Sequence, residues 1–168
     1  MSKDIILGID PGFGRVGWGV IEKVGSDWRA VDWGCIETSP KLEFVDRLAQ
    51  LHREVVGLIK KYRPDRMAVE ELFFFKNVTT AIQVAQARGV ILLSAINHGL
   101  PVDEFTPLEV KQAMTGYGRA EKGQMQKLVA VLLHVKEKIK SDDAADALAV
   151  ALTAGQCRNF NTKTRIPK

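Results

Sequence analysis

The spacing of hydrophobic residues along the chain changes near residue 42. Before that point, short apolar runs alternate with turn residues, a pattern that predicts antiparallel strands at about 5–10, 16–22 and 28–38. Pro11-Gly12 ends the first strand, and Gly25-Ser26-Asp27 provides the turn between the second and the third.

After residue 42, apolar residues recur every three or four positions, which predicts one buried stripe of a helix at about 42–62. The stripe consists of Phe44, Leu48, Leu51, Val55, Leu58 and Tyr62. We expect a fourth strand at 66–70, a second helix at about 77–97 with Asn77 as N-cap, and a fifth strand at 101–106. Further helices are expected near 107–115, 121–134 and 141–160.

The second helix is apolar on nearly every side in its latter half, around Val90-Ile91-Leu92-Leu93. Such a helix has to be covered on two faces, and we expect the sheet and a second subunit to cover them. The order βββαβαβα, with no repeat or long linker, predicts one mixed α/β domain at 1–157. Residues 158–168 form a basic tail, a candidate for disorder.

Composition narrows the function classes only slightly. The chain has 168 residues with 46% hydrophobic and 26% charged residues, typical of one globular domain, and its net charge of +4 fits a polyanionic partner among many others. It shows no signal peptide and no apolar stretch of about 18 residues, so no membrane span is expected. Cys35 and Cys157 have no metal-site spacing and favour a reducing cytoplasm.

Two acidic residues stand at the ends of predicted apolar strands. Asp10 ends the first strand and Glu70 ends the fourth, so both side chains point into one crevice if these strands are neighbours, while Glu71 faces the other way. Each has an ordinary structural interpretation as well, because Asp before Pro-Gly is common in turns and a glutamate at a strand end is usually solvated.

A third acidic cluster opens the last helix at Ser141-Asp142-Asp143-Ala144-Ala145-Asp146. Ser141 is a good N-cap, and acids in the first turn are favoured by the helix dipole, which accounts for Asp142. Asp146 lies one turn further along, among alanines. Asp143 with Asp146 (i, i+3) or Asp142 with Asp146 (i, i+4) would share one helix face, and spacing does not choose between them.

Carboxylates that converge on one site repel each other unless cations neutralise them. Oxygen ligands without His or Cys suit Mg²⁺ or Mn²⁺ better than Zn²⁺. A pair of such ions stabilises the attacking and leaving oxygens of a phosphoryl displacement, so the acids predict metal-dependent phosphodiester chemistry.

Aromatic and basic residues supply candidates for DNA contact. Phe73-Phe74-Phe75 precedes Lys76 and Asn77, and successive side chains diverge, so at least one phenylalanine is expected to be exposed and able to stack on a base. A hydrophobic plug at the sheet end is an equally good interpretation for any one of them. Lys111 and Lys122 lie on the later helices, where most lysines only solvate a surface.

Taken together, these segments resemble the RuvC family, the bacterial Holliday-junction resolvases of the RNase H-like nuclease superfamily. The matching stretches, in family order, are Gly8-Ile9-Asp10-Pro11-Gly12, Ala68-Val69-Glu70, Lys76-Asn77, Gln86-Ala87-Arg88-Gly89-Val90, Val110-Lys111-Gln112, Ala120-Glu121-Lys122 and Asp143-Ala144-Ala145-Asp146-Ala147-Leu148-Ala149.

The resemblance implies an α/β fold with an RNase H-like mixed five-stranded sheet flanked by helices. It places the four catalytic and metal-binding acids at Asp10, Glu70, Asp143 and Asp146, which selects Asp143 over Asp142. It implies DNA contacts by Phe73, Lys76, Lys111 and Lys122.

It also implies two Mg²⁺ per site, replaceable by Mn²⁺, a homodimer, and paired cuts in four-way junction DNA that leave 5′-phosphate and 3′-hydroxyl ends. The branch-migration proteins RuvA and RuvB are implied as partners.

Three rival interpretations remain. One is an RNase H-like nuclease acting on hybrids or other branched substrates, and another is a junction-binding protein without catalysis. The third is an actin-like ATPase, for which 168 residues are too few.

Overall fold

A mixed five-stranded sheet forms the centre of the molecule in the computed structural model, which describes residues 4–72, 78–116 and 122–157, without the side chains of residues 78, 79 and 122. The strand order is β3-β2-β1-β4-β5. The strands are β1 (Ile5–Asp10), β2 (Arg15–Val24), β3 (Asp27–Glu37), β4 (Arg66–Glu70) and β5 (Val102–Phe105). The expected α/β architecture is therefore confirmed.

The first three strands form an antiparallel meander, and β4 and β5 continue the sheet in parallel with β1. β2 is longer than the sequence pattern predicted, and β3 begins one residue earlier, because the turn between them needs only Gly25 and Ser26. Gly25 has a φ of 65°, a left-handed conformation that glycine adopts without steric cost. This tight turn lets the two strands pair along their whole length.

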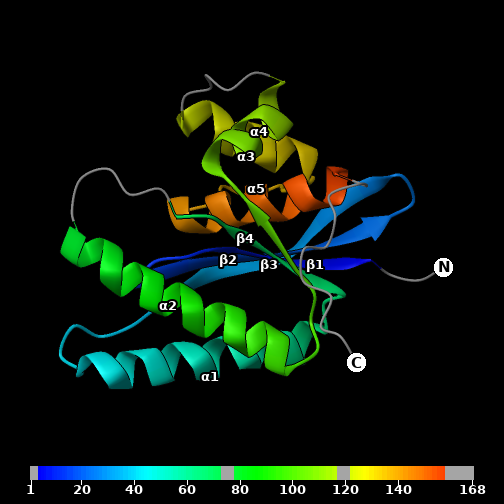
Figure 1. Ribbon diagram of the computed structural model, residues 1–168. Coiled ribbons are helices and arrows are strands. Elements are labelled where there is room, and N and C mark those ends of the chain that lie inside the picture. Colours follow the sequence, from blue (N-terminus) through cyan, green and yellow to red (C-terminus); the bar gives the residue numbers. More distant parts are fainter. Residues whose placement is uncertain (1–3, 73–77, 117–121, 158–168) are drawn as a thin grey trace.

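Helices cover both faces of the sheet (Figure 1). α1 (Phe44–Tyr62) and α2 (Val78–Asn97) lie on one face, and α3 (Pro107–Thr115), α4 (Lys122–Leu132) and α5 (Asp142–Gln156) lie on the other. Alternate residues of β1 divide between these two layers: Leu7 and Ile9 pack toward α1 and α2, whereas Ile6 packs toward α5. Asp10 follows the same alternation and belongs to the α5 side.

The ends of α3 agree with the sequence pattern, whereas α4 ends at Leu132, two residues before the expected end. α1 ends where Arg63 adopts a left-handed conformation, and α3 begins with a capping box between Thr106 and Glu109. The last helix was expected to reach residue 160, and this was wrong, because α5 ends at Gln156 and Cys157 leaves the helical conformation. No glycine or proline after Gln156 marks that end in the sequence. The predicted N-cap Asn77 lies outside the described residues.

α5 lies directly against the backbone of the sheet because β1 and β2 carry glycines where it crosses. A Cβ added at Gly8 would lie 2.1 Å from the carbonyl oxygen of Ala147. One added at Gly17 would lie 1.9 Å from the carbonyl oxygen of Asp143. These glycines are therefore needed for the close approach that brings the start of α5 to the end of β1.

Within the described ranges, no helix is long and apolar enough to cross a bilayer. Cys35 and Cys157 are both free thiols.

We expect Gly17→Ala to lower the free energy of unfolding by about 1–3 kcal/mol, because the added methyl group overpacks α5 against β2. Gly57→Ala in α1 is the matched control, since nothing lies within 4 Å of a Cβ added there. That control should leave stability unchanged or raise it by roughly 0.5–1 kcal/mol through helix propensity. Urea unfolding measures both, and a Gly17→Ala protein as stable as the wild type would contradict the contact.

Candidate active site

Asp10 and Glu70 come together because their strands are adjacent and parallel. β1 and β4 pair from Ile6 with Arg66 to Ile9 with Val69, so the two acids lie one position beyond the last pair. Ile9 and Val69 both point toward the α1 and α2 layer, and the following residues therefore point toward α5. The sequence prediction that these acids share a crevice is consistent with this register.

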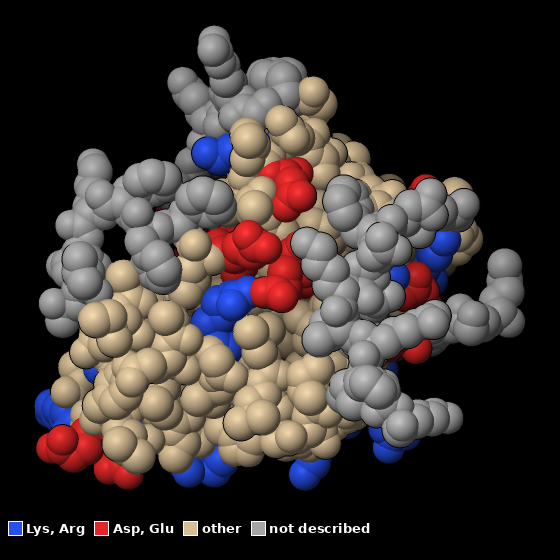
Figure 2. All heavy atoms as spheres, in the orientation of Figure 1, with Lys and Arg blue, Asp and Glu red and all other residues tan. Residues whose placement is uncertain are grey.

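Asp143 and Asp146 reach the same place from the first turns of α5. Ser141 caps the helix by accepting a hydrogen bond from the backbone N–H of Ala144 at 3.3 Å. The contact between α5 and the glycines of β1 and β2 then places this end of the helix over the end of the sheet. Figure 2 shows acidic side chains gathered on this face of the molecule, with a basic side chain directly against them.

Burial and like charge act together on the two strand-end acids. The pKa of Asp10 is raised to about 8, first by burial and then by the negative charges of Glu70, Asp146 and Asp143. The pKa of Glu70 is also raised, mainly by burial and then by Asp146, while Lys111 opposes the shift. A hydrogen bond joins Asp10 to Glu70. The pair therefore retains a proton at neutral pH.

Asp142 and Asp143 have different surroundings, although spacing alone treated them as equivalent. Asp142 accepts a hydrogen bond from the side-chain amide of Gln126 on α4. Asp143 is among the groups that raise the pKa of Asp10 and forms an ion pair with Arg15, with 3.0 Å between Arg15 Nε and Asp143 Oδ2.

Two residues of this neighbourhood, Arg15 and Cys35, were not identified from the sequence. The Cys35 sulfur lies 2.8 Å from the Ser141 hydroxyl and 3.8 Å from Nη2 of Arg15. Both residues belong to the β2–β3 hairpin, where Gly17 pairs with Cys35 and Arg15 pairs with Glu37. No motif or periodicity marks them, because their contacts with Ser141 and Asp143 arise only when α5 folds onto the hairpin.

A hollow of about 200 Å³ continues the site between α3, α4 and α5. Glu70, Lys111 and Asp146 provide its polar lining, and its other lining residues are Pro107, Val110, Met125 and Ala149. Lys111 thus lies beside two of the acids. Lys122 begins α4 but its side chain is not described, and Phe73 and Lys76 fall outside the described residues.

Glu71 points away from this site, as strand alternation predicted. It lines a separate hollow together with Ala85 and Arg88 of α2, on the opposite face of the sheet. Arg88, which belongs to one of the stretches that match the family, is ion-paired there with Glu104.

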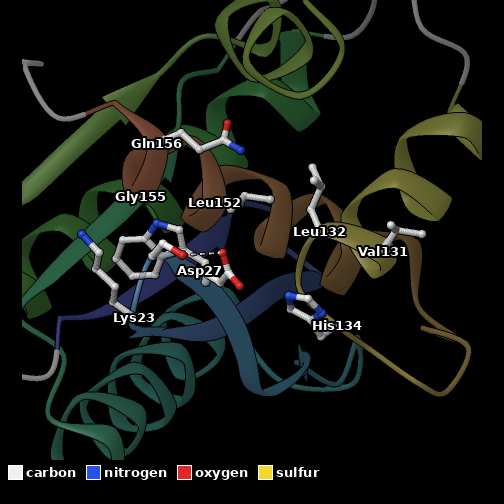
Figure 3. A pocket seen from close by; sticks show the side chains of 10 residues that line it. Lys23, Asp27, Val131, Leu132, His134, Leu152, Gly155 and Gln156 are labelled. Carbon is white, nitrogen blue, oxygen red and sulfur yellow. Dashed lines mark hydrogen bonds between the residues drawn. The ribbon is translucent and has the colours of Figure 1, made fainter.

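Another hollow, of about 460 Å³, lies at the other end of the sheet (Figure 3). Lys23, Asp27 and Trp28 from the β2–β3 turn region line it, together with His134 and the ends of α4 and α5. Because Arg15 and Lys23 lie near opposite ends of β2, this hollow is separate from the acidic site.

The acids of the site fit a hard divalent cation by their chemistry. Their ligands are carboxylate oxygens, and a cation would relieve the repulsion that raises the pKa of Asp10. As the side chains stand in the described part of the chain, no three acid, His or Cys groups form a ready-made ligand cluster. Asp143 is held by Arg15, and Asp10 is hydrogen-bonded to Glu70.

In EDTA, we expect the thermal midpoint to fall as the pH is raised from about 4 to about 8. Over this range Asp10 is ionised in the unfolded chain, where its pKa has the ordinary value of 3.8. It is protonated in the folded protein, where its pKa is about 8. The folded state therefore binds more protons, and stability decreases with rising pH. Asp10→Asn should flatten this dependence and be more stable than the wild type at pH 8.

Asp46→Asn, at an exposed acid in the first turn of α1, is the control for this measurement. An Asp10→Asn protein with the same pH slope as the wild type would show that Asp10 is not under electrostatic strain.

Comparison with known proteins agrees with this geometry. The chain is 54% identical over 159 residues to the crossover junction endodeoxyribonuclease RuvC of Halothermothrix orenii, covering 95% of this chain and 96% of the relative. It is 52% identical over 154 residues to that of Petrotoga mobilis, covering 92% and 94%.

The structure of Thermus thermophilus RuvC in complex with Holliday junction substrate superposes with a TM-score of 0.86 at 35% identity, covering 90% of this chain and 93% of that one. The yeast mitochondrial Holliday junction resolvase Ydc2, at 15% identity and a TM-score of 0.67, shares the fold. The expected RNase H-like fold is thereby confirmed.

The profile of the family described as crossover junction endodeoxyribonuclease RuvC matches residues 6–154. With relatives above 50% identity along most of its length, the chain belongs to the RuvC family of endonucleases.

Proposed function

We propose that this chain resolves four-way DNA junctions by hydrolysis at a site where Asp10, Glu70, Asp143 and Asp146 hold two divalent cations, Mg²⁺ with Mn²⁺ as a substitute. The observation that carries the proposal is the excess of negative charge at this site, expressed in the pKa of about 8 for Asp10. The name of the chain's relatives and the junction-bound structure of the Thermus relative support the choice of substrate.

Asp10, Glu70, Asp143 and Asp146 would hold the metal ions, whose positive charge would favour attack by water on the phosphorus and departure of the 3′ oxygen, giving a 5′-phosphate and a 3′-hydroxyl. The protein's own part is to assemble and ionise the ligands. Asp10 gives up the proton that it shares with Glu70, and Lys111 favours the ionised form of Glu70. Burial of the two strand-end acids lowers the local dielectric constant, which strengthens their interaction with a cation.

DNA contacts would come from Lys111, Lys122, Lys76 and Phe73. Lys111 is exposed and lines the same hollow as Glu70 and Asp146, so its ammonium group is suited to a phosphate near the cut. Phe73 would stack on an unpaired base. Contacts of this kind give binding that depends on salt and is largely independent of sequence.

A homodimer would use α2. Ala87, Ile91, Ser94 and Ala95 are buried against the rest of the chain. On the other side of the helix, Ile82 and Leu93 are 57% and 58% exposed, and the exposed residues Gln86 and Gly89 lie between them at helical spacing. An interface here would cover this exposed stripe with its two large apolar side chains, and a two-fold axis would place two identical sites on one symmetric junction.

The remaining parts of the proposal are a single nuclease domain at 1–157 with a basic tail at 158–168, delivery of the substrate by RuvA and RuvB, and a cytoplasmic location where Cys35 and Cys157 stay reduced. An RNase H-like nuclease that prefers hybrids or other branched substrates is the alternative, because it would use the same acids.

The central test is cleavage of a synthetic four-way junction, a matching linear duplex and an RNA–DNA hybrid in Mg²⁺, with products located on denaturing gels. We expect paired nicks in the junction alone, lost in EDTA. Asp10→Asn should lower the rate by about 100-fold or more, because a metal ion supplies several kcal/mol of transition-state stabilisation. It should still bind the junction, and Asp46→Asn should cleave normally.

Cutting of the hybrid in place of the junction would favour the alternative substrate. Junction binding without cleavage in either Mg²⁺ or Mn²⁺ would contradict the catalytic assignment.

For the dimer, we expect Leu93→Asp to shift the protein toward monomer in sedimentation at micromolar concentration, because it places a charge in an apolar interface. Val45→Asp is the matched control, since Val45 is 72% exposed on α1. Equal dimerisation of both variants would show that the interface lies elsewhere.

A further inference from the structure

Arg15 holds one of the four acids of the site by a direct ion pair. Its Nε lies 3.0 Å from Oδ2 of Asp143, and its Nη2 lies 3.7 Å from Oε1 of Glu37. The Arg15 side chain is 55% exposed and that of Asp143 is 35% exposed. The guanidinium is therefore in contact with solvent as well as with the acid.

The fold builds this contact in. Arg15 is the first residue of β2, and Gly17, two positions along the same strand, approaches the carbonyl oxygen of Asp143 so closely that no side chain fits between them. The start of α5 is therefore fixed relative to the start of β2. Cys35 completes the neighbourhood, with its sulfur 4.0 Å from Oδ2 of Asp143.

We propose that Arg15 is the resident counter-cation of Asp143 and competes with a divalent cation for that carboxylate. The inference rests on the proposed metal site. Arg15 carries one positive charge and meets one of the four acids, so it leaves the repulsion among the others in place. A divalent cation brings twice that charge, and it is repelled by the guanidinium as well as attracted by the acids.

Competition outweighs any benefit of holding Asp143 in place. An aspartate has few rotamers to lose, so fixing it in advance contributes little to ligand binding. Removing a positive charge from the edge of a cation site removes a repulsion that acts on every bound ion. The pair is partly exposed, so water screens it, and we expect the net effect on cation affinity to be about two- to fivefold.

The experiment measures cation binding by the DNA-free protein, where no cleavage takes place. Free Mn²⁺ is counted by electron paramagnetic resonance during a titration, and Mg²⁺ is measured by its competition with Mn²⁺. Arg15→Gln should bind Mn²⁺ about two- to fivefold more tightly than the wild type. Arg15→Lys keeps the charge without the planar fork and should lie between the two.

Arg29→Gln is the matched control. It removes the same charge from an exposed position of β3 that lies opposite Glu22 in the strand ladder, far from the start of β2. Its affinity for Mn²⁺ should equal that of the wild type. Thermal unfolding in EDTA establishes that each variant is folded. If Arg15→Gln does not fold, the comparison of Arg15→Lys with the wild type decides.

Unchanged or weaker Mn²⁺ binding by a folded Arg15→Gln protein, with normal binding by the wild type, would overturn this inference and leave the proposed metal site intact. If the wild type itself binds no Mn²⁺, the proposed metal site falls and the role of Arg15 falls with it. Tighter binding by Arg15→Gln and Arg29→Gln alike would reduce the effect to net charge and would also overturn it.

Discussion

Repulsion among carboxyl groups is the interaction around which this molecule is organised. Asp10 and Glu70 are partly buried, and the negative charges of α5 face them. Buried carboxyl groups that face other acids destabilise the folded state. The rest of the structure must therefore supply enough stabilisation to offset this repulsion. It does so with apolar contacts, because both faces of the sheet are covered by continuous hydrophobic clusters.

Positive charge reaches the acids from two sides, and the two contributions differ. Lys111, on α3, lies beside Glu70 and Asp146 in a hollow open to solvent, and it favours the ionised form of Glu70. Arg15, on β2, contacts Asp143 directly. One basic side chain therefore comes from the helical layer and one from the sheet. Together they partly balance the site, while Asp10 in the middle keeps its raised pKa.

Much of this arrangement was predictable from the sequence where local pattern decides. Apolar residues at every second position predicted the strands, and apolar residues at every third or fourth position predicted the helices. Asp10 and Glu70 were predicted at strand ends, and they share one crevice because β1 and β4 are neighbours. The end of α5 was missed because nothing after Gln156 signals a stop. Spacing did not separate Asp142 from Asp143, whose different partners, Gln126 and Arg15, depend on tertiary packing.

The role of Arg15 could not be read from the sequence for the same reason. It is separated from Asp143 by most of the chain, and only the folding of α5 onto the β2–β3 hairpin brings the two together. Phe73, Lys76 and the side chain of Lys122 lie outside the described part of the chain, so their contacts with DNA remain predictions.

The glycine contacts of α5 give the site walls of unequal stiffness. Where Gly8 and Gly17 meet α5, the contact joins backbone to backbone, and no rotatable side chain is present to absorb a displacement. Across the site, Lys111 and Met125 line an open hollow with long side chains that can change rotamer. The side chains of α3 and α4 can therefore adjust to the shape of a bound strand. The distance between β1 and α5 stays constant.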